Sequence, residues 1–226
     1  FRKFGTFDKI IGVNIGKNKD TLNAIDDYTY LIEELGSLSS YITVNISSPN
    51  TEGLRDLQLR GNIENLIKKI LQKRDQIESI NLKPVLIKIS PDLNDNQLRD
   101  IALISLANNV DGLILTNTTI TRNQLLSKFK FKTGGLSGKP LYDQSNKIIK
   151  KMYNFTNGQI PIIGVGGISN GIDCYNKMKA GASLIQLYTA LIYSGPSLIS
   201  KINKELIDLI RTDGYKNIAE VVGKSV

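Results

Sequence analysis

The sequence predicts an α/β fold of the TIM (β/α)8-barrel type that is incomplete, with six of the eight strand–helix units, corresponding to strands 3–8. Short apolar runs alternate six times with amphipathic segments of helical period, and no break of domain size interrupts them. Polar residues and glycines fall at the carboxyl end of each apolar run. Convergence from one end of successive strands is typical of a barrel mouth, whereas an open sheet gathers its ligand groups at one switch point.

The six apolar runs predict strands that are buried on both faces, as in a parallel sheet. They are Ile10–Ile15, Tyr41–Ile46, Pro84–Ile89, Gly112–Leu115, Pro161–Val165 and Leu184–Leu187. The amphipathic segments between and after them predict helices with one buried face. These are Asp27–Leu35, Ile63–Ile77, Gln97–Leu106, Gln144–Met152, Ile172–Met178 and Pro196–Ile210. Asn94, Asn170 and Gly195 are predicted N-caps, with Pro196 at the first helical position.

Composition excludes several classes of function. The chain has 226 residues, no histidine and one cysteine, so a Ser-His-Asp triad, a histidine-ligated metal and an internal disulfide are excluded, and we expect no metal site. The net charge of +8 is spread over scattered lysines, which indicates solvated helix faces and no nucleic-acid partner. No apolar stretch is long enough for a membrane-spanning helix, and we expect this chain alone to be soluble and cytoplasmic. The opening Phe1–Lys3 lacks an initiator methionine and suggests a piece of a longer chain.

Polar side chains and glycines at the strand ends are the candidate site. The turn Gly164–Ser169 follows a strand and precedes a helix, so its amides and the helix dipole are suited to a phosphate, although tight packing alone also explains such a turn. If this turn and Tyr188–Thr189 are the phosphate loops of a barrel, the last two strands are the seventh and eighth. Lys88 ends an apolar strand, where a lysine faces an anion or an electron-rich ring, or extends to water. Thr116–Thr119 carries amide and hydroxyl groups that suit a planar heterocycle.

The segment Asn45–Arg55 is the most informative. Two asparagines flank a Ser-Ser-Pro corner, where Pro49 fixes the backbone and Gly53 permits a reversal. Without histidine, Ser48 is a poor nucleophile for acyl transfer, but it can relay a proton. We also expect Ser48–Gln58 to act as a lid, and the long connection Thr119–Pro140 to be functional.

These motifs resemble the dihydroorotate dehydrogenase family, class 2 (quinone-dependent), truncated at the N-terminus. The resemblance is carried by Asn-Ile-Ser-Ser-Pro-Asn-Thr from Asn45, Gly-Gly-Leu-Ser-Gly-Lys-Pro-Leu from Gly134, and the segments Val85–Leu93, Asp111–Thr119 and Ile162–Leu191. Class 1 members have a cysteine where Ser48 stands, and the only cysteine here, Cys174, falls in a helix, where it is expected to be a packed residue.

The resemblance implies FMN as cofactor and oxidation of dihydroorotate to orotate in pyrimidine biosynthesis, with a hydride passing to the flavin, quinone reoxidising it, and Ser48 as the base. It implies that the pyrimidine is held by Asn45, Asn50, Asn117 and Thr118. It implies that FMN is held by Asn14, Asn45, Lys88, Thr116, Ser137, Gly138, Gly166, Gly167, Tyr188 and Thr189. The family also implies peripheral membrane association through an N-terminal extension, and we expect residues 1–226 to lack that extension together with the first two barrel units.

Three interpretations stay open from sequence. The chain is an FMN-dependent dihydroorotate dehydrogenase, another FMN- or phosphate-binding barrel acting on a different pyrimidine, or a non-catalytic remnant or complementing fragment. We expect residues 1–226 to form one FMN-binding barrel domain.

Overall fold

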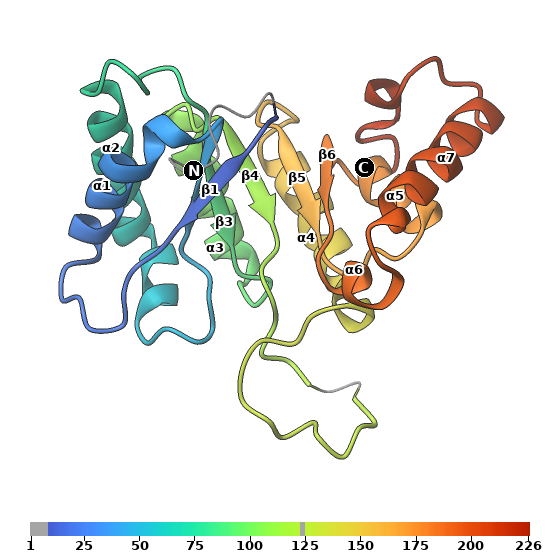
Figure 1. The fold of residues 1–226 in the computed structure, drawn as a ribbon, viewed down its shortest axis with the longest axis horizontal. Helices are drawn as coiled ribbons and strands as arrows, with labels where there is room; N and C mark the ends of the chain where they lie inside the picture. Colours follow the sequence, from blue (N-terminus) through green and yellow to red (C-terminus); the bar gives the residue numbers. More distant parts are fainter. Residues whose placement is uncertain (1–8, 123–124) are drawn as a thin grey trace.

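The fold is one six-stranded parallel sheet in which the strands follow their order in the chain (Figure 1). The computed structural model describes residues 9–122 and 125–226, so the opening Phe1–Lys3 lies outside the described residues. The strands are β1 (Gly12–Ile15), β2 (Tyr41–Asn45), β3 (Val85–Ile89), β4 (Gly112–Leu115), β5 (Ile162–Val165) and β6 (Leu184–Gln186). All six predicted strands are confirmed.

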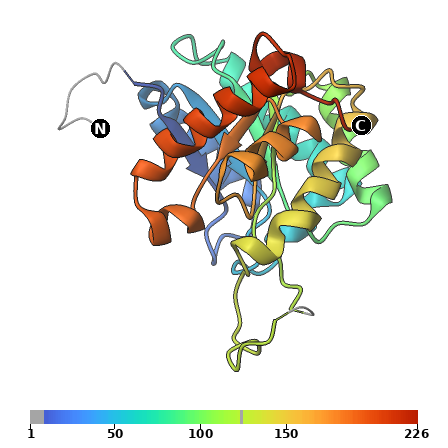
Figure 2. The same ribbon diagram turned by 90° about the vertical axis from the view of Figure 1, so that its right-hand side faces the viewer.

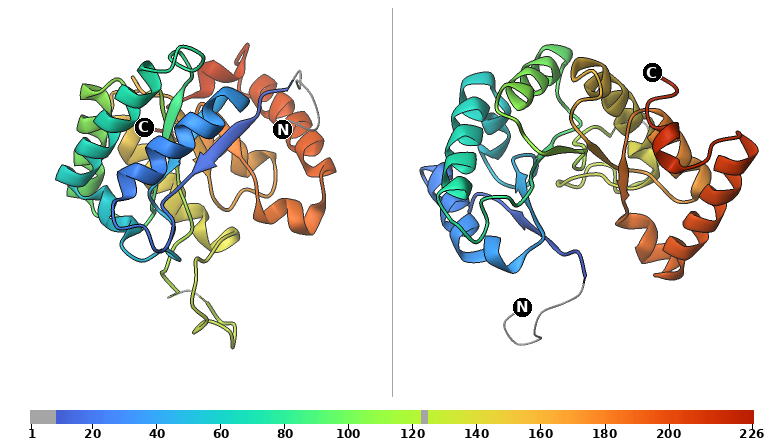
Figure 3. Two further views of the ribbon diagram at one scale, coloured as in Figure 1. Left: turned by 60° about the vertical axis from the view of Figure 1, so that its left-hand side comes forward. Right: turned by 90° about the horizontal axis from the view of Figure 1, so that it is seen from above.

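The sheet curls into an open half-barrel with its helices on the convex side (Figure 3). Because β1 and β6 are the two ends of the strand order, each pairs with a single neighbour. The predicted incomplete barrel of six strand–helix units is therefore confirmed.

Side chains alternate between the two faces of each strand. In β3, Val85, Ile87 and Ile89 belong to the main core beneath the helices. Leu86 instead belongs to a small inner cluster with Ile114 and Ile163. Alternation places Lys88 on the same inner face as Leu86 and directs it into the concave side of the half-barrel.

The helices cover the sheet as predicted, with one addition. They are α1 (Ala24–Leu35), α2 (Arg60–Asp75), α3 (Asp95–Ala107), α4 (Tyr142–Phe155), α5 (Gly171–Lys179), α6 (Thr189–Ser194) and α7 (Ser197–Thr212). The short α6 was not predicted, because six residues carry too little periodicity to distinguish a helix from a loop.

Two of the three predicted N-caps are confirmed. Asn94 accepts a hydrogen bond from the Gln97 amide in a capping box, and Asn170 accepts from the Asp173 amide. The prediction for Gly195 is wrong, because Gly195 ends α6 with a φ of 71° and Pro196 takes the N-cap position of α7. The intervening α6 shifts the start of α7 by one residue.

The connection from β4 to α4 projects away from the half-barrel (Figure 2). Its base is closed by a two-residue antiparallel bridge between Thr119 and Leu136, whose amides donate to each other's carbonyls at 3.1 and 2.7 Å. Within the described ranges, no helix has the length and apolarity needed to cross a bilayer.

Candidate functional site

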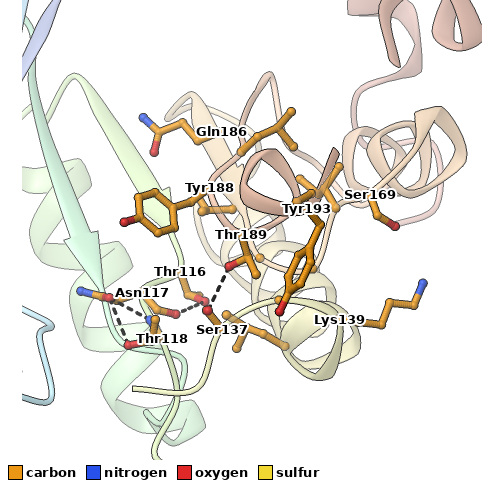
Figure 4. A pocket seen from close by; sticks show the side chains of 18 of the residues that line it. Thr116, Asn117, Thr118, Ser137, Lys139, Ser169, Gln186, Tyr188, Thr189 and Tyr193 are labelled. Atoms are coloured by element: carbon orange, nitrogen blue, oxygen red, sulfur yellow. Dashed lines mark hydrogen bonds between the residues drawn. The ribbon is translucent and has the colours of Figure 1, made fainter. Parts of the chain in front are cut away.

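A cavity of about 560 Å³ opens at the carboxyl ends of β3 to β6 (Figure 4). It collects ten of the residues that the sequence predicts for the site: Lys88, Thr116, Asn117, Thr118, Ser137, Gly138, Gly166, Gly167, Tyr188 and Thr189. This size lies within the range of small-molecule and cofactor sites. The structure thus brings together groups that are up to about a hundred residues apart in sequence, as a barrel mouth does.

Amide and hydroxyl groups link the cavity wall to the end of β2. The Asn117 side-chain nitrogen donates to Asn45 Oδ1 at 3.2 Å and to Ser47 Oγ at 3.0 Å. The Ser47 hydroxyl donates to the same Asn45 oxygen at 2.9 Å, and the Thr118 amide donates to Asn117 Oδ1 at 2.8 Å. The Asn117 amide is therefore held in one orientation, with Asn45 immediately behind the lining residues.

Ser48 and Asn50 lie beside the cavity on the loop that follows β2, outside its lining. The Asn50 amide donates to Ser48 Oγ at 3.3 Å. Pro49 packs against Gly135, where an added Cβ would stand 3.1 Å from the proline ring and 1.8 Å from Thr118 Oγ1. Only glycine permits this close approach between the Ser-Ser-Pro corner and the β4–α4 connection.

Asn14 is the predicted site residue farthest from the cavity. It is exposed on β1, in register with Thr43 of β2, and it does not line the cavity. Its strand neighbours Val13 and Ile15 pack into the core beneath the helices, so Asn14 faces the concave side.

Arg55 anchors the loop that the sequence predicts as a lid. Its guanidinium donates to Asp92 Oδ2 at 2.8 Å, to the Ser47 carbonyl at 3.2 Å and to the Thr118 carbonyl at 3.1 Å. The adjoining Gln58 is buried and accepts from the Ser90 amide at 2.8 Å. The prediction of a lid over all of Ser48–Gln58 is wrong for Leu54–Gln58, which forms a 3₁₀ turn fixed to β3 and β4 by these bonds.

Asp92 is the acidic partner in this anchor and was missed by sequence reasoning. It accepts hydrogen bonds from Thr119 Oγ1, from the Ile120 amide and from Arg55. Burial raises the pKa of the Asp92 carboxyl, but these bonds and the Arg55 charge outweigh burial and hold the pKa below its usual value. Since polar contacts between distant loops leave no periodic signal, this ion pair could not be read from the sequence.

Lys88 supplies the cavity with a cation. Its side chain is half-buried, and burial lowers the pKa of the ammonium group. Among residues 9–122 and 125–226, no carboxylate pairs with it. A half-buried lysine without an anion is costly unless a ligand compensates it. Lys88 lines the cavity, and its role toward a ligand stays a prediction.

The glycine turn after β5 has the backbone shape that favours close approach. Gly166 and Gly167 have φ angles of 120° and 73°, a region that glycine adopts most readily. The dipole of α5 stabilises a phosphate at the glycine turn less than the sequence predicts, because α5 begins only at Gly171. The Asp173 and Gly171 amides already donate to Asn170 and Glu205. An anion here would depend mainly on the amides of the turn itself.

The wall opposite Asn117 is formed by Ser137, Gly138 and the start of α6. The Thr189 hydroxyl donates to Ser137 Oγ at 2.9 Å, which ties the end of the β4–α4 connection to α6 (Figure 4). Tyr188 is 77% exposed at the rim. The cavity also includes Ser169, which ends the predicted phosphate turn, and Lys139, Gln186 and Tyr193, which sequence reasoning did not name as site residues. Lys139 stands in a quoted motif, whereas Tyr193 belongs to the unpredicted α6.

Cys174 is buried in α5. Burial raises the pKa of its thiol to about 12, which keeps the thiol protonated at neutral pH and unsuited to nucleophilic chemistry. The expected packed residue is confirmed.

The fold and site define a β/α-barrel protein with one mouth-side cavity rich in hydroxyl, amide and glycine groups. The family model for dihydroorotate dehydrogenase matches residues 2–210, and the chain belongs to this family. Its similarity is to the quinone-dependent class 2, as predicted. It is 45% identical over 218 residues to "Dihydroorotate dehydrogenase (quinone), mitochondrial" of Arabidopsis thaliana, a match that covers 95% of this chain and 47% of the relative.

A bacterial relative and a solved structure give the same family. The chain is 47% identical to "Dihydroorotate dehydrogenase (quinone)" of Parvibaculum lavamentivorans, covering 96% of this chain and 61% of that one. The crystal structure of ligand-free DHODH from Eimeria tenella superposes with a TM-score of 0.92 at 41% identity, covering 95% of this chain and 64% of that chain. The chain therefore spans about half to two thirds of the length of these relatives.

Proposed function

We propose that residues 1–226 form the FMN-binding barrel domain of a quinone-dependent dihydroorotate dehydrogenase, which oxidises dihydroorotate to orotate. The observation that carries this proposal is one cavity lined by Lys88, which pairs with no carboxylate among the described residues, by the oriented Asn117 amide and by the glycine turn at Gly166–Gly167. Family membership supports the activity, and the donor set supports a planar, anionic cofactor.

The residues present fit FMN. The glycine turn at Gly166–Gly167, with Gly138 and the hydroxyls of Ser137 and Thr189, would hold the phosphate end. Lys88 and Thr116 would hold the ring system, with Asn45, Asn14 and the Tyr188 backbone at its periphery. When bound, FMN supplies the hydride acceptor. The Lys88 ammonium would stabilise negative charge on the ring, because no carboxylate in the described part of the chain pairs with it.

The amide cluster next to the ring would hold the pyrimidine, through Asn45, Asn50, Asn117 and Thr118. Both side-chain donors of Asn117 are already bonded to Asn45 and Ser47. A substrate oxygen that binds the Asn117 nitrogen would therefore replace one of these bonds, and the amide is positioned before substrate arrives.

Ser48 would take the proton that leaves the substrate. It lies one residue from Ser47, which is bonded to Asn117, and on the part of its loop that precedes the Arg55 anchor. Residues 48–53 are the part of this loop left to close over substrate, since Leu54–Gln58 is fixed. Quinone would then reoxidise the flavin, as the names of the relatives indicate for those proteins.

Flavin titration followed by anaerobic reduction tests this function. The wild-type chain is expected to bind FMN, with a shift in its visible spectrum, and to bleach it on adding dihydroorotate. Lys88→Met should abolish or strongly weaken FMN binding, whereas Lys69→Met, an exposed lysine on α2, should not. Ser48→Ala should bind FMN normally but lose about 10² to 10⁴ in the rate of bleaching, the usual contribution of a positioned base.

The competing function is a complementing fragment that binds no flavin alone. The observation in its favour is the open half-barrel, in which β1 and β6 each have one partner and Leu184 of β6 is 61% exposed. If the protein is colourless after incubation with millimolar FMN and removal of the free flavin, autonomous cofactor binding is rejected and this alternative is favoured. Bleaching by another pyrimidine but not by dihydroorotate would instead favour a different barrel oxidoreductase.

A further inference from the structure

Lys177 is a buried cation outside the cavity lining. It lies on α5, its side chain is fully buried, and it packs behind the glycine turn that follows β5. Lysine is among the residues least often fully buried, because removing its charge from water is costly. Its position therefore needs a compensating interaction or a function.

The Lys177 ammonium is joined to the glycine turn through a single intermediate side chain. Its Nζ donates to Ser145 Oγ at 3.0 Å and to Asn146 Oδ1 at 2.6 Å, both at the start of α4. The Ser145 hydroxyl in turn donates to the carbonyl of Val165 at 2.5 Å, immediately before Gly166. Lys177 thus fixes the backbone that leads into the turn.

Two further contacts make the same connection. The aliphatic part of Lys177 fills the space beside Gly164, where an added Cβ would stand 2.6 Å from its Cδ. Its ammonium lies 5.4 Å from the centre of the Tyr142 ring, and the Tyr142 backbone closes on Gly167, whose added Cβ would stand 2.7 Å from the Tyr142 Cα. The lysine therefore contacts the turn's neighbours on both sides.

The charge of Lys177 is not neutralised by an ion pair with any described residue. The nearby Asp173 accepts from the Ser169 amide and hydroxyl at 3.0 and 2.7 Å, and its ion pair at 3.6 Å is with Lys139. Neutral oxygens and an aromatic face surround Lys177 instead. A buried positive charge at low dielectric acts over a longer range than one in water.

We propose that Lys177 is a positioning residue for the anionic end of the cofactor: it sets the Gly166–Gly167 turn through Ser145 and adds positive potential behind it. This inference rests on the proposed function, which places the FMN phosphate at that turn. It predicts that Lys177 favours FMN over riboflavin. The uncharged riboflavin has the same ring and ribityl chain as FMN but no phosphate on which the Lys177 charge can act.

The test compares FMN with riboflavin, by flavin fluorescence, in the wild type and in Lys177→Met at pH 6, which lies below the pKa of about 7 to which burial lowers Lys177, so that the ammonium is charged. The variant is expected to bind FMN about tenfold or more weakly and riboflavin within about twofold of wild type, since a hydrogen-bonded charge contributes on this scale. Lys179→Met is the matched control, from the same helix but paired with Asp213, and should leave both affinities unchanged.

Ser145→Ala keeps the inference testable if Lys177→Met does not fold. This substitution removes the hydrogen bond to the Val165 carbonyl. It should weaken FMN binding by about threefold to tenfold and leave riboflavin binding nearly unchanged. Where both variants fold, the double variant should lose little more than Lys177→Met alone, because both act through one chain of contacts.

Equal losses of FMN and riboflavin, or no loss of either, would overturn this inference while leaving the proposed function standing. A Ser145→Ala variant that binds both flavins like wild type would do the same. A wild-type chain that binds neither flavin would overturn the proposed function, and this inference with it.

Discussion

The two sides of the cavity are built in different ways. The first side is formed by the ends of β3 and β4, with the end of β2 and the loop Ile46–Gln58 behind them, and it is held by bonds between polar side chains such as Asn45–Asn117 and Arg55–Asp92. The second side is formed by the ends of β5 and β6 with α6. Its shape comes from glycine backbone at Gly166–Gly167 and from the buried Lys177 behind it.

This difference separates two ways of specifying a site. On the first side, each polar group is oriented by named partners, so a substitution should act through lost hydrogen bonds. On the second side, the glycines have no side chains. A substitution there should act either by adding atoms to a glycine or by removing the buried Lys177 that packs behind the turn. The following predictions separate these two modes.

The largest expected effect is on the first side, at Arg55. Arg55→Ala leaves the Asp92 carboxylate, only 14% exposed, without its cationic partner and frees two loop carbonyls. We expect the free energy of unfolding to fall by about 4 kcal/mol, the usual cost of breaking a buried ion pair from one side. Urea denaturation, monitored by far-UV circular dichroism, measures this loss of unfolding free energy.

Arg60→Ala is the matched control for Arg55, because the Arg60–Asp100 pair is of similar length, 2.9 Å against 2.8 Å, but has an arginine that is 70% exposed. Its cost should stay below about 1 kcal/mol. Equal costs for the two variants would mean that the Arg55 anchor is no more than a surface contact.

The next effect is on the second side, at Gly167. Gly167→Ala places a methyl group at a φ of 73° and within 2.5 Å of the Tyr142 Cβ. We expect a loss of about 3 kcal/mol, from backbone strain together with the displacement of Tyr142. Gly53→Ala has a similar φ of 69° but a nearest atom at 3.9 Å, and should lose only about 1 kcal/mol by the same measurement.

Much of the fold was predictable from sequence, because it depends on local patterns. Continuous apolar runs such as Val85–Ile89 gave the strands, and helical periodicity in segments such as Ile63–Ile77 gave the helices. The barrel followed from polar groups at the ends of the strands, and its incompleteness followed from counting strands back from the two predicted phosphate loops. The short α6 could not be predicted by this route, and the N-cap of α7 was displaced with it.

The site was predictable where a residue's chemistry disagreed with its surroundings. Lys88 in an apolar strand and the glycine pair at Gly166–Gly167 are such cases, and both line the cavity. The anchor between Arg55 and Asp92 was not predictable, because it joins groups 37 residues apart with no repeating pattern. Lys177 was missed for the opposite reason: on an amphipathic helix, a lysine is read as a solvated residue, and only packing shows that it is buried.

A third prediction concerns pH and the second side. Burial lowers the pKa of Lys177 to about 7, while Asp173 and Cys174 raise it in part. Between pH 7 and 9, the unfolded lysine keeps a proton that the folded one releases, so wild-type stability should rise with pH relative to Lys177→Met. The difference in unfolding free energy between wild type and variant should change by about 2 kcal/mol from pH 7 to pH 9. Urea denaturation at these two pH values measures it.

The other ionisable groups around Lys177 do not reverse this sign. Tyr142 faces it from α4, and Lys139 pairs with Asp173. Burial raises the pKa of the Cys174 thiol to about 12 in the folded protein, so the unfolded thiol begins to lose its proton within this interval and lowers the stability of wild type and variant alike. All of these groups are present in wild type and variant alike. A difference in stability that stays constant from pH 7 to 9 would show that Lys177 remains charged in the folded protein.

The smallest effect returns to the first side, at Ser47. Ser47→Ala removes one bond to Asn45 and one from Asn117, and should cost about 1 kcal/mol of unfolding free energy. Asn117→Ala removes the other end of the same network, so the two losses should overlap by about 0.5 kcal/mol or more in a double-mutant cycle. Pairing Ser47→Ala with Gly167→Ala provides the contrast, because these residues share no hydrogen bond. Strict additivity within the first side would show that the Ser47 and Asn117 bonds act independently, whereas strong coupling between the sides would show that the cavity is one cooperative unit.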